Sequence, residues 1–165
     1  MTKSRSATSS TPYLRVSASG VHGLGAYATR ALPAGAFLGL YEGRRYTPEQ
    51  IAAKTWNDQL TYLFMLSNDE TIDGGKGGNA TRHLNHSCAP NCEAVEEYDE
   101  SGELVLKFQT LVDVDAGDEL FIDYGLTADD GSPASDYVCH CGAATCRGTM
   151  LAPVDEAVSD QVFRN

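Results

Sequence analysis

The sequence has no long apolar run and little positive charge. No stretch approaches the roughly 20 apolar residues that a membrane-spanning helix needs, and the Ser/Thr-rich start, residues 1–11, contains no segment of the signal-peptide type. Lys and Arg total 12 against 23 Asp and Glu, and the formal net charge is −11. Phosphate binding needs clustered Lys and Arg, so we expect neither direct nucleic-acid binding nor membrane association. A cytoplasmic location is expected, with secretion as an effector as the alternative.

Cysteine is also scarce, which argues against a disulfide-stapled fold. Five cysteines, an odd number in a chain without an export signal, are better explained by metal binding or catalysis. Cys139, Cys141 and Cys146 offer three thiolates within eight residues, whereas a structural zinc site needs four ligands. The fourth ligand can be Cys88 or Cys92. The alternative is that these cysteines are unlinked core residues.

Glycine and proline, by contrast, punctuate the chain. Its 165 residues are 42% hydrophobic, enough for one domain with a core. The 16 glycines and 6 prolines favour many short strands joined by turns, so we expect a mostly-β fold. By its alternation, residues 104–109 should form a half-buried strand. The expected strands are residues 13–16, 25–29, 37–41, 60–66, 104–109 and 120–123.

One clear helix is expected after Thr47. Thr47 can cap it, Pro48 suits the first helical position and Gln50 completes a capping box. The helix should run to about Trp56. The remaining segments are expected to be a loop at residues 74–78, a turn at 113–118, a polar linker at 127–135 and a short terminal helix at 155–165.

The most informative segment, residues 82–92, reads RHLNHSCAPNC. Asn, His and Cys rarely crowd together in this way unless backbone geometry or chemistry requires them. Two further clusters follow in order, GDELFIDYG at residues 117–125 and the cysteines of residues 139–146. In this order the three clusters resemble the SET-domain protein lysine methyltransferases with their post-SET zinc-binding tail. The resemblance covers about residues 13–151.

The resemblance implies a β-clip fold and a division of the chain. The family fold has several small curved sheets, a C-terminal segment threaded beneath a loop as a pseudoknot, and a zinc-bound tail. Residues 1–12 are then a disordered lead-in, 13–128 the SET domain, 136–151 the post-SET segment and 152–165 a tail. The same resemblance assigns structural Zn²⁺ to Cys88, Cys139, Cys141 and Cys146, which leaves Cys92 as a buried or free thiol.

The resemblance also implies S-adenosylmethionine as the cofactor. Two glycines around Leu24 are by themselves a tight-turn pattern, and the third glycine of a dinucleotide-binding loop is missing. In the family, the matching segment lets backbone groups approach the methionine end of the cofactor. Asn85 and His86 can alternatively satisfy buried backbone groups, and His83 stands where the family commonly has an aromatic residue. The residues that the resemblance assigns to the cofactor are His22, Gly23, Leu24, Tyr62, Arg82, Asn85 and His86.

Tyr124 matches the catalytic tyrosine of the family. A buried tyrosine taken by itself more often finds one hydrogen-bond partner and packs. The resemblance places Tyr41, Phe64 and Ile122 along the channel that admits the substrate lysine. Many relatives carry Phe or Tyr at the Ile122 position, and a Tyr hydroxyl there accompanies stopping at one methyl. Because Ile122 has no hydroxyl, addition of more than one methyl is expected.

These matches predict a protein-lysine N-methyltransferase. It would transfer a methyl group from S-adenosylmethionine to a lysine of a basic protein, such as a histone or a histone-like protein. The acidic charge suits basic partners, although it also serves solubility alone. The alternative is a non-catalytic, zinc-stabilised peptide-binding module with the same fold, and a purely structural protein would bind no cofactor.

Overall fold

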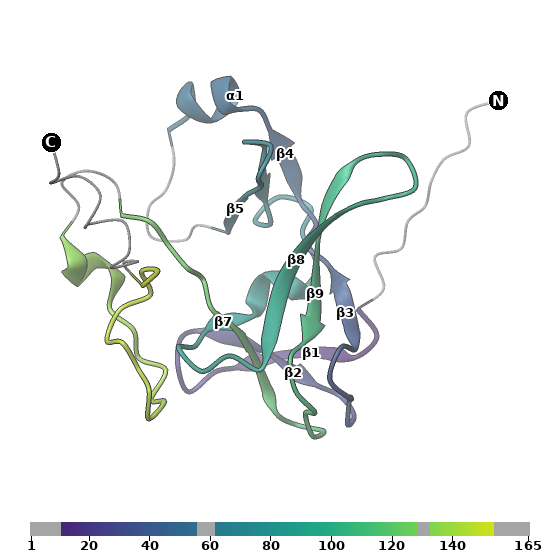
Figure 1. Cartoon of the computed structure of the whole chain (residues 1–165), viewed down its shortest axis with the longest axis vertical. Helices are drawn as coiled ribbons and strands as arrows, with labels where there is room; N and C mark the ends of the chain where they lie inside the picture. The colour runs from purple at the N-terminus through teal and green to yellow at the C-terminus, as the bar shows by residue number, and fades with distance from the viewer. Residues whose placement is uncertain (1–10, 56–61, 129–132, 154–165) are drawn as a thin grey trace, which may run out of the picture.

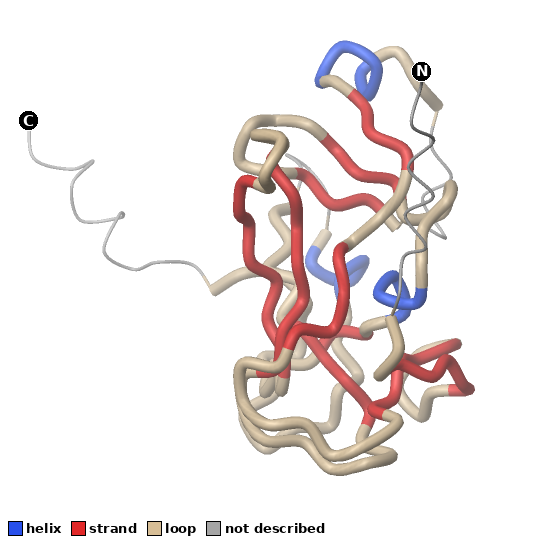
Figure 2. The backbone as a smooth tube through the Cα atoms, turned by 90° about the vertical axis from the view of Figure 1, so that its right-hand side faces the viewer, coloured by secondary structure: helices blue, strands red, loops and turns tan. Residues whose placement is uncertain are grey.

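The computed structural model describes residues 11–55, 62–128 and 133–153, and short strands dominate it (Figures 1 and 2). The predicted mostly-β fold of several small sheets is confirmed. The helical segments are α1 (Pro48–Ala52) and the 3₁₀ helices η1 (Ala80–His83) and η2 (Ala134–Tyr137). The strands are β1 (Leu14–Ala18), β2 (Leu24–Ala28), β3 (Phe37–Leu40), β4 (Arg44–Tyr46), β5 (Leu63–Met65), β6 (Thr71–Asp73), β7 (Asn85–His86), β8 (Cys92–Tyr98), β9 (Leu104–Thr110) and β10 (Glu119–Ile122).

The strands form three small sheets. Their strand orders are β1-β2-β10-β7, β3-β9-β8 and β4-β6-β5. Neighbouring strands are antiparallel except β10 and β7, which run parallel with Phe121 opposite Asn85 and Ile122 opposite His86. This pairing joins two clusters of the sequence, because it lays the strand that precedes Tyr124 beside Asn85 and His86.

Strand β9 carries the centre of the core. Leu104, Val105, Leu106 and Phe108 are buried, whereas Lys107 and Gln109, on either side of Phe108, are partly exposed. The predicted half-buried strand is therefore confirmed. Fully buried residues of the same core lie on three other strands: Ala26 of β2, Leu38 of β3 and Leu120 of β10.

Helix α1 starts as predicted and ends earlier. The Thr47 hydroxyl accepts the Gln50 backbone N–H at 3.4 Å, and the Gln50 side chain accepts the Thr47 N–H at 2.9 Å, so the capping box is present. The last helical residue is Ala52, whereas the predicted end at Trp56 lies outside the described residues. No residue of α1 is buried, so tertiary packing does not extend a helix that its cap nucleates.

Four strands were not predicted. β4, β6 and β7 comprise two or three residues each, which is too short for a hydrophobic period to be visible. β8 was missed because three of its seven residues are glutamates. The loop predicted at 74–78 is confirmed, with a turn at 74–77.

Other expectations fall partly outside the described residues. β5 occupies the second half of the predicted strand at 60–66, and residues 60 and 61 are not described. The 3₁₀ helix η2 begins inside the predicted linker at 127–135, of which 129–132 are not described. The predicted helix at 155–165 and most of the lead-in also lie outside these ranges. No helix in the described part of the chain is long and apolar enough to cross a membrane.

Candidate active site

Four cysteines meet beside β7. The sulfur atoms of Cys88, Cys139, Cys141 and Cys146 all lie within 4.8 Å of one another, and all four are free of disulfides. We call these residues the thiol cluster. Tetrahedral zinc with sulfur ligands at about 2.3 Å would separate the sulfurs by about 3.8 Å, and Cys88 Sγ lies 3.7 Å from Cys139 Sγ. The cluster therefore has the ligand type, number and spacing of a structural zinc site.

Backbone N–H groups point at the sulfurs of the thiol cluster. N–H donors favour a thiolate over a thiol, and metal coordination needs the thiolate. The tail thus supplies donors as well as ligands. The three contacts are Cys141 N to Cys139 Sγ at 3.4 Å, Arg147 N to Cys88 Sγ at 3.4 Å and Gly148 N to Cys146 Sγ at 3.3 Å.

Cys92 lies apart from the thiol cluster. Its side chain is fully buried in the apolar core. Burial raises the pKa of the Cys92 thiol to about 12, so it stays neutral at physiological pH. Cys92 is therefore a small core residue, and the structure brings Cys88 to the tail instead.

The His86 ring connects the thiol cluster to Tyr124. Its Nδ1 accepts the backbone N–H of Tyr124 at 3.0 Å, so the ring proton sits on Nε2, which lies 3.4 Å from Cys88 Sγ. Burial lowers the pKa of His86, although the carboxylate of Asp123 acts in the opposite direction. Nδ1 lies 3.5 Å from Asp123 Oδ1, but a neutral ring whose Nδ1 is an acceptor makes no ion pair there. His86 thus donates to one cluster sulfur and holds the Tyr124 backbone.

Tyr124 follows β10 and packs, partly buried, against the core. Its ring packs against His86, with 5.3 Å between ring centroids. The hydroxyl donates to the Leu84 carbonyl at 3.0 Å. Burial raises the pKa of Tyr124 to about 12, and nearby Tyr62 adds to the rise. The phenol is therefore protonated at neutral pH, and its hydroxyl is a hydrogen-bond donor.

Asn85 fixes the loop that carries three of the predicted cofactor residues. Its Nδ2 donates to the carbonyls of His22 at 3.2 Å and Leu24 at 3.0 Å, and to Glu119 Oε1 at 3.1 Å. Gly25 permits this close approach, because a Cβ there would lie 2.1 Å from Glu119 Oε1. The loop from His22 to Leu24 is exposed, so its outer side is accessible to a ligand.

Tyr62, Arg82 and His83 form a second group. The Arg82 guanidinium carbon lies 5.6 Å from the Tyr62 ring centroid, and the His83 ring centroid lies 6.0 Å from it. Arg82 Nη1 donates to the Gly74 carbonyl at 3.2 Å and Nε donates to His83 Nε2 at 3.1 Å. Burial, followed by the Arg82 charge, lowers the pKa of His83. His83, for which no role was predicted, therefore supports Tyr62 and Arg82 as a neutral ring.

The residues predicted to line a lysine channel pack together. The Tyr41 hydroxyl donates to the Tyr62 carbonyl at 2.6 Å, and its ring centroid lies 5.4 Å from that of Phe64 and 5.7 Å from that of Phe108. Ile122 is buried in the same core, and Phe64 and Tyr124 pack against it. The structure therefore brings these residues together around one cluster of rings.

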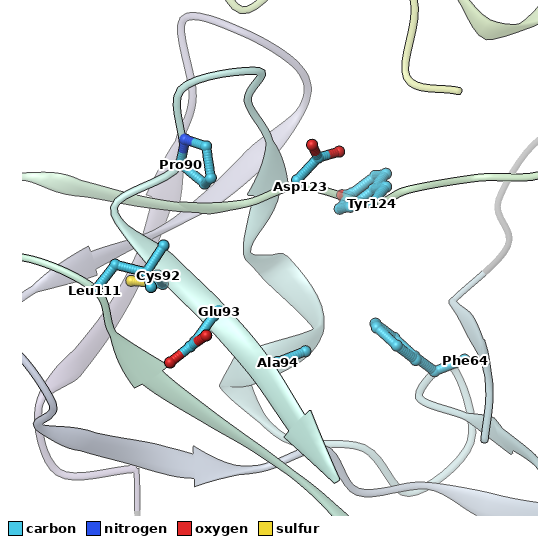
Figure 3. Close-up of a pocket in the computed structure, with 8 residues that line it drawn as sticks. All are labelled: Phe64, Pro90, Cys92, Glu93, Ala94, Leu111, Asp123 and Tyr124. Carbon is cyan, nitrogen blue, oxygen red and sulfur yellow. The ribbon is translucent and has the colours of Figure 1, made fainter. Parts of the chain in front are cut away.

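A cavity of about 360 Å³ opens next to Tyr124 (Figure 3). In Figure 3, Phe64 and Tyr124 lie at one end of it, and Cys92 and Leu111 lie at the other. We call it the β8 cavity, because three consecutive residues of β8 line it. The lining residues are Phe64, Pro90, Cys92, Glu93, Ala94, Leu111, Asp123 and Tyr124. Sequence reasoning missed the β8 part of this lining because it missed the strand.

An ion pair fastens the C-terminal segment to the backbone around Tyr124. The Arg147 guanidinium makes two hydrogen bonds of 2.9 Å to Asp123, one to each carboxylate oxygen. Burial alone would raise the pKa of Asp123, but the hydrogen bonds and charge of Arg147, with the Gly125 N–H, lower it. This pair was not predicted, although opposite charges beside two motifs were visible in the sequence.

The family follows from these features together with a direct comparison. The SET domain model matches residues 23–125. This chain belongs to the SET domain family. The match contains β2 to β10, Asn85, His86 and Tyr124, and it ends before the three tail cysteines.

Relatives of the chain are named as histone-lysine N-methyltransferases. The chain is 37% identical over 133 residues to SETD2 of Homo sapiens, and the aligned region covers 78% of this chain and 5% of that protein. It is 34% identical over 133 residues to NSD3 of Mus musculus, which covers 78% of this chain and 9% of that protein. It is 32% identical over 144 residues to the H3 lysine-4 specific enzyme of Cryptococcus neoformans, which covers 83% of this chain and 10% of that protein. The chain thus spans a tenth or less of the length of these relatives.

Proposed function

We propose that this SET domain transfers the methyl group of S-adenosylmethionine to the side-chain amine of a lysine in a basic protein. The observation that carries the proposal is a continuous set of contacts around Tyr124. Its hydroxyl bonds to Leu84, its backbone bonds to His86, and the neighbouring Asn85 holds the loop at His22. The names of the relatives support the same class of activity.

The cofactor side of the proposed site is built from Asn85 and Tyr62. S-adenosylmethionine, when bound, supplies a methyl group on a positively charged sulfur. The Nδ2 of Asn85 donates to the His22 loop. Its Oδ1 accepts no hydrogen bond within the described residues, so this oxygen can accept a hydrogen bond from the ammonium group of the cofactor. Tyr62, supported by Arg82, offers a ring face for the adenosyl group. In this proposal Asn85 accepts from the ammonium end of the cofactor and Tyr62 packs against its adenosyl end.

The substrate side is the set of rings at Tyr41, Phe64 and Tyr124. A lysine amine titrates near 10.4 in water, and enclosure among apolar rings lowers that pKa. The neutral amine nitrogen then gains a bond to the methyl carbon and loses one proton to solvent, while the carbon–sulfur bond breaks. Tyr124 contributes by position, because its oxygen lone pairs and the Leu84 carbonyl suit a cationic methyl donor.

The thiol cluster would hold a structural zinc ion. All four ligand positions are filled by cysteine sulfurs, which leaves no open position for a substrate or water, as is typical of a structural site. The ion would fix the tail beside His86, and His86 would transmit that placement to the Tyr124 backbone. This proposal gives zinc a role in assembling the site and none in the bond-making step.

Ile122 is proposed to allow more than one round of transfer. It is buried in the core against which Tyr124 packs, and it has no hydroxyl with which to hold the amine or a water molecule. Mass spectrometry of the product at long reaction times should show dimethyl or trimethyl lysine. The variant Ile122→Tyr should shift the product towards monomethyl lysine, and monomethyl product alone from the unchanged protein would contradict this part of the proposal.

Methyl transfer from labelled cofactor onto a panel of basic proteins tests the function. The zinc-loaded protein should label at least one lysine-rich protein, and Tyr124→Phe should lower the rate by about a hundredfold or more. Calorimetry should show that Tyr124→Phe still binds S-adenosylhomocysteine, because the ring and its backbone remain. The non-catalytic module is supported instead if the unchanged protein binds peptide but neither cofactor nor its product.

A further inference from the structure

The β8 cavity follows the open edge of a strand. Among the described residues, β8 is an outer strand of its sheet and pairs with β9 alone. Successive side chains of a strand point to opposite faces, yet the neighbours Glu93 and Ala94 both line the cavity. The cavity therefore runs along the strand edge, where an extended peptide can add its own backbone hydrogen bonds.

The charges of the cavity lining are unevenly compensated. Its two carboxylates belong to Glu93 and Asp123, and none of its lining residues is cationic. Asp123 is neutralised by the two hydrogen bonds from Arg147. Glu93 accepts one hydrogen bond of 2.7 Å from the neutral amide of Gln109 on its Oε1, and no cation within the described residues pairs with it. The cavity thus presents one uncompensated negative charge at a fixed position.

The position of Glu93 relative to Tyr124 is also fixed. Asn91, directly before β8, donates from Nδ2 to the Glu119 carbonyl at 2.8 Å and accepts the Phe121 N–H on Oδ1 at 2.8 Å. This clamp ties the start of β8 to β10. Glu93 lies two residues after the clamp on one strand, and Tyr124 lies three residues after Phe121 on the other. Glu93 and Tyr124 also line the same cavity, so a peptide that runs through this cavity with its lysine at Tyr124 would pass Glu93.

We propose that Glu93 is a specificity-determining residue that pairs with a cationic side chain close to the target lysine. The inference rests on the proposed function and names its substrate class more narrowly: an extended segment with Lys or Arg beside the methylated lysine. Gln109 bonds to Oε1 of Glu93, so Oε2 can accept one N–H from that cation. Glu93 is half-buried. Charge-assisted hydrogen bonds of this kind are stronger than neutral ones.

Kinetics with matched peptides test the proposal. Each peptide carries one lysine, and a single neighbouring residue is Arg, Gln or Glu, placed in turn at each nearby position. At one position the unchanged protein should prefer Arg over Gln by roughly threefold to tenfold in kcat/KM. Glu93→Gln keeps an acceptor for Gln109 and should remove this preference. Glu93→Lys should reverse it in favour of the Glu peptide.

Glu97→Gln is the matched control. Glu97 lies on the same strand, is exposed and pairs with Lys107 outside the cavity lining. This variant loses the same charge and should keep the Arg preference. Equal preference in the unchanged protein and in Glu93→Gln, or a uniform loss on all peptides in Glu93→Gln, overturns the role of Glu93. Failure of every peptide and protein to accept a methyl group would instead count against the proposed function itself.

Discussion

Tyr124 stands between two regions that are held together by different forces. In the C-terminal segment, residues 133–153, Cys139 is the one buried residue of those described. In β9, by contrast, five of the seven residues are buried. The sheet is stabilised by apolar area removed from water, whereas the tail buries less apolar area to offset the loss of chain entropy on ordering.

The tail is therefore held by point contacts. These are the thiol cluster, the Asp123–Arg147 ion pair, the His86 hydrogen bonds and one short backbone bridge between Leu126 and Leu151. The thiol cluster and the ion pair depend on metal and protonation state, and burial of apolar side chains does not. The comparison implies that the tail can unfold while the sheet that contains β9 remains folded.

Metal removal should produce the largest difference between the two regions. Binding of structural zinc is coupled to folding of the segment that supplies its ligands. When a chelator strips the zinc-loaded protein, the tail should lose its protection in hydrogen exchange while β9 keeps its protection. Binding of S-adenosylhomocysteine and methyl transfer should fall together with the tail. Equal protection of the tail before and after chelation would mean that it does not depend on the metal.

Two cysteine variants provide the control for metal removal. Cys141→Ala removes one sulfur of the thiol cluster and should abolish tight zinc binding. Cys92→Ala removes a buried sulfur outside the cluster and should retain a single zinc ion, with the modest loss of stability expected of a small core truncation. Atomic absorption on both purified proteins distinguishes the two roles.

The core side of the comparison is tested by Phe108→Ala. Phe108 is fully buried between the Tyr41 and Phe64 rings, so its truncation should lower the free energy of unfolding by about 3–5 kcal/mol. Tyr98→Ala, at an exposed position of the same sheet, should change it by less than about 0.5 kcal/mol. Urea titration in excess zinc measures both. If Phe108→Ala destabilised the tail alone and left the sheet unchanged, the separation of the two regions would be contradicted.

The sequence was informative where the chemistry of a residue type is unusual. A zinc site with three cysteines in the tail requires a fourth ligand, whatever surrounds it. The pair Thr47 and Gln50 likewise predicts a helix start from local chemistry alone. The four cysteines meet and the capping box is present. The choice between Cys88 and Cys92 depended on the family resemblance, because both lie in one short segment.

The sequence was uninformative where function arises from pairing across the fold. No strand was predicted over β8 because three of its seven residues are glutamates, and it is a strand because β9 supplies its pairing partner. Glu93 and Arg147 look like ordinary surface charges until the fold sets one in a cavity and the other against Asp123. Such roles depend on neighbours that are distant in the sequence.

His86 links the two regions through two hydrogen bonds, one to Cys88 and one to the Tyr124 backbone, and each bond can be removed separately. His86→Asn keeps an acceptor near the Nδ1 position for the Tyr124 amide but loses the donor to Cys88. His86→Gln keeps a donor near the Nε2 position and loses the acceptor. Removal of such a supporting group commonly costs about tenfold to a hundredfold in metal affinity. His86→Asn should therefore lose more zinc affinity, and His86→Gln should lose more of kcat.

Chelator competition and saturating-cofactor kinetics separate these two effects. Zinc affinity measured against a chromogenic chelator reports the Cys88 contact and is independent of turnover. A measured cofactor Kd for each variant excludes a loss of cofactor binding as the cause of a lower kcat. Identical losses of zinc affinity and kcat in both variants would show that His86 acts by packing alone, and would remove the hydrogen-bonded link between the regions.

The smallest expected effect concerns the pH dependence where the two regions meet. Burial raises the pKa of Tyr124 from about 10 to about 12. Its stabilising contribution is therefore complete below about pH 10 and is lost only as pH rises through about 12. Between pH 7 and about 9.5 the titrating group should be the substrate amine, near 10.4. The logarithm of kcat/KM should then rise by about one per pH unit.

The Tyr124→Phe variant should show the same slope of log kcat/KM against pH, although its rate is lower. The slope is unchanged because it reports the titration of the substrate amine. Zinc content is measured at each pH, so that a change in the tail is not mistaken for a change at the phenol. If Tyr124 acted as a base, its removal would flatten the profile of the remaining activity. A slope that is retained in Tyr124→Phe while zinc stays bound would instead assign the phenol to positioning, and the tail, through His86, to holding it in place.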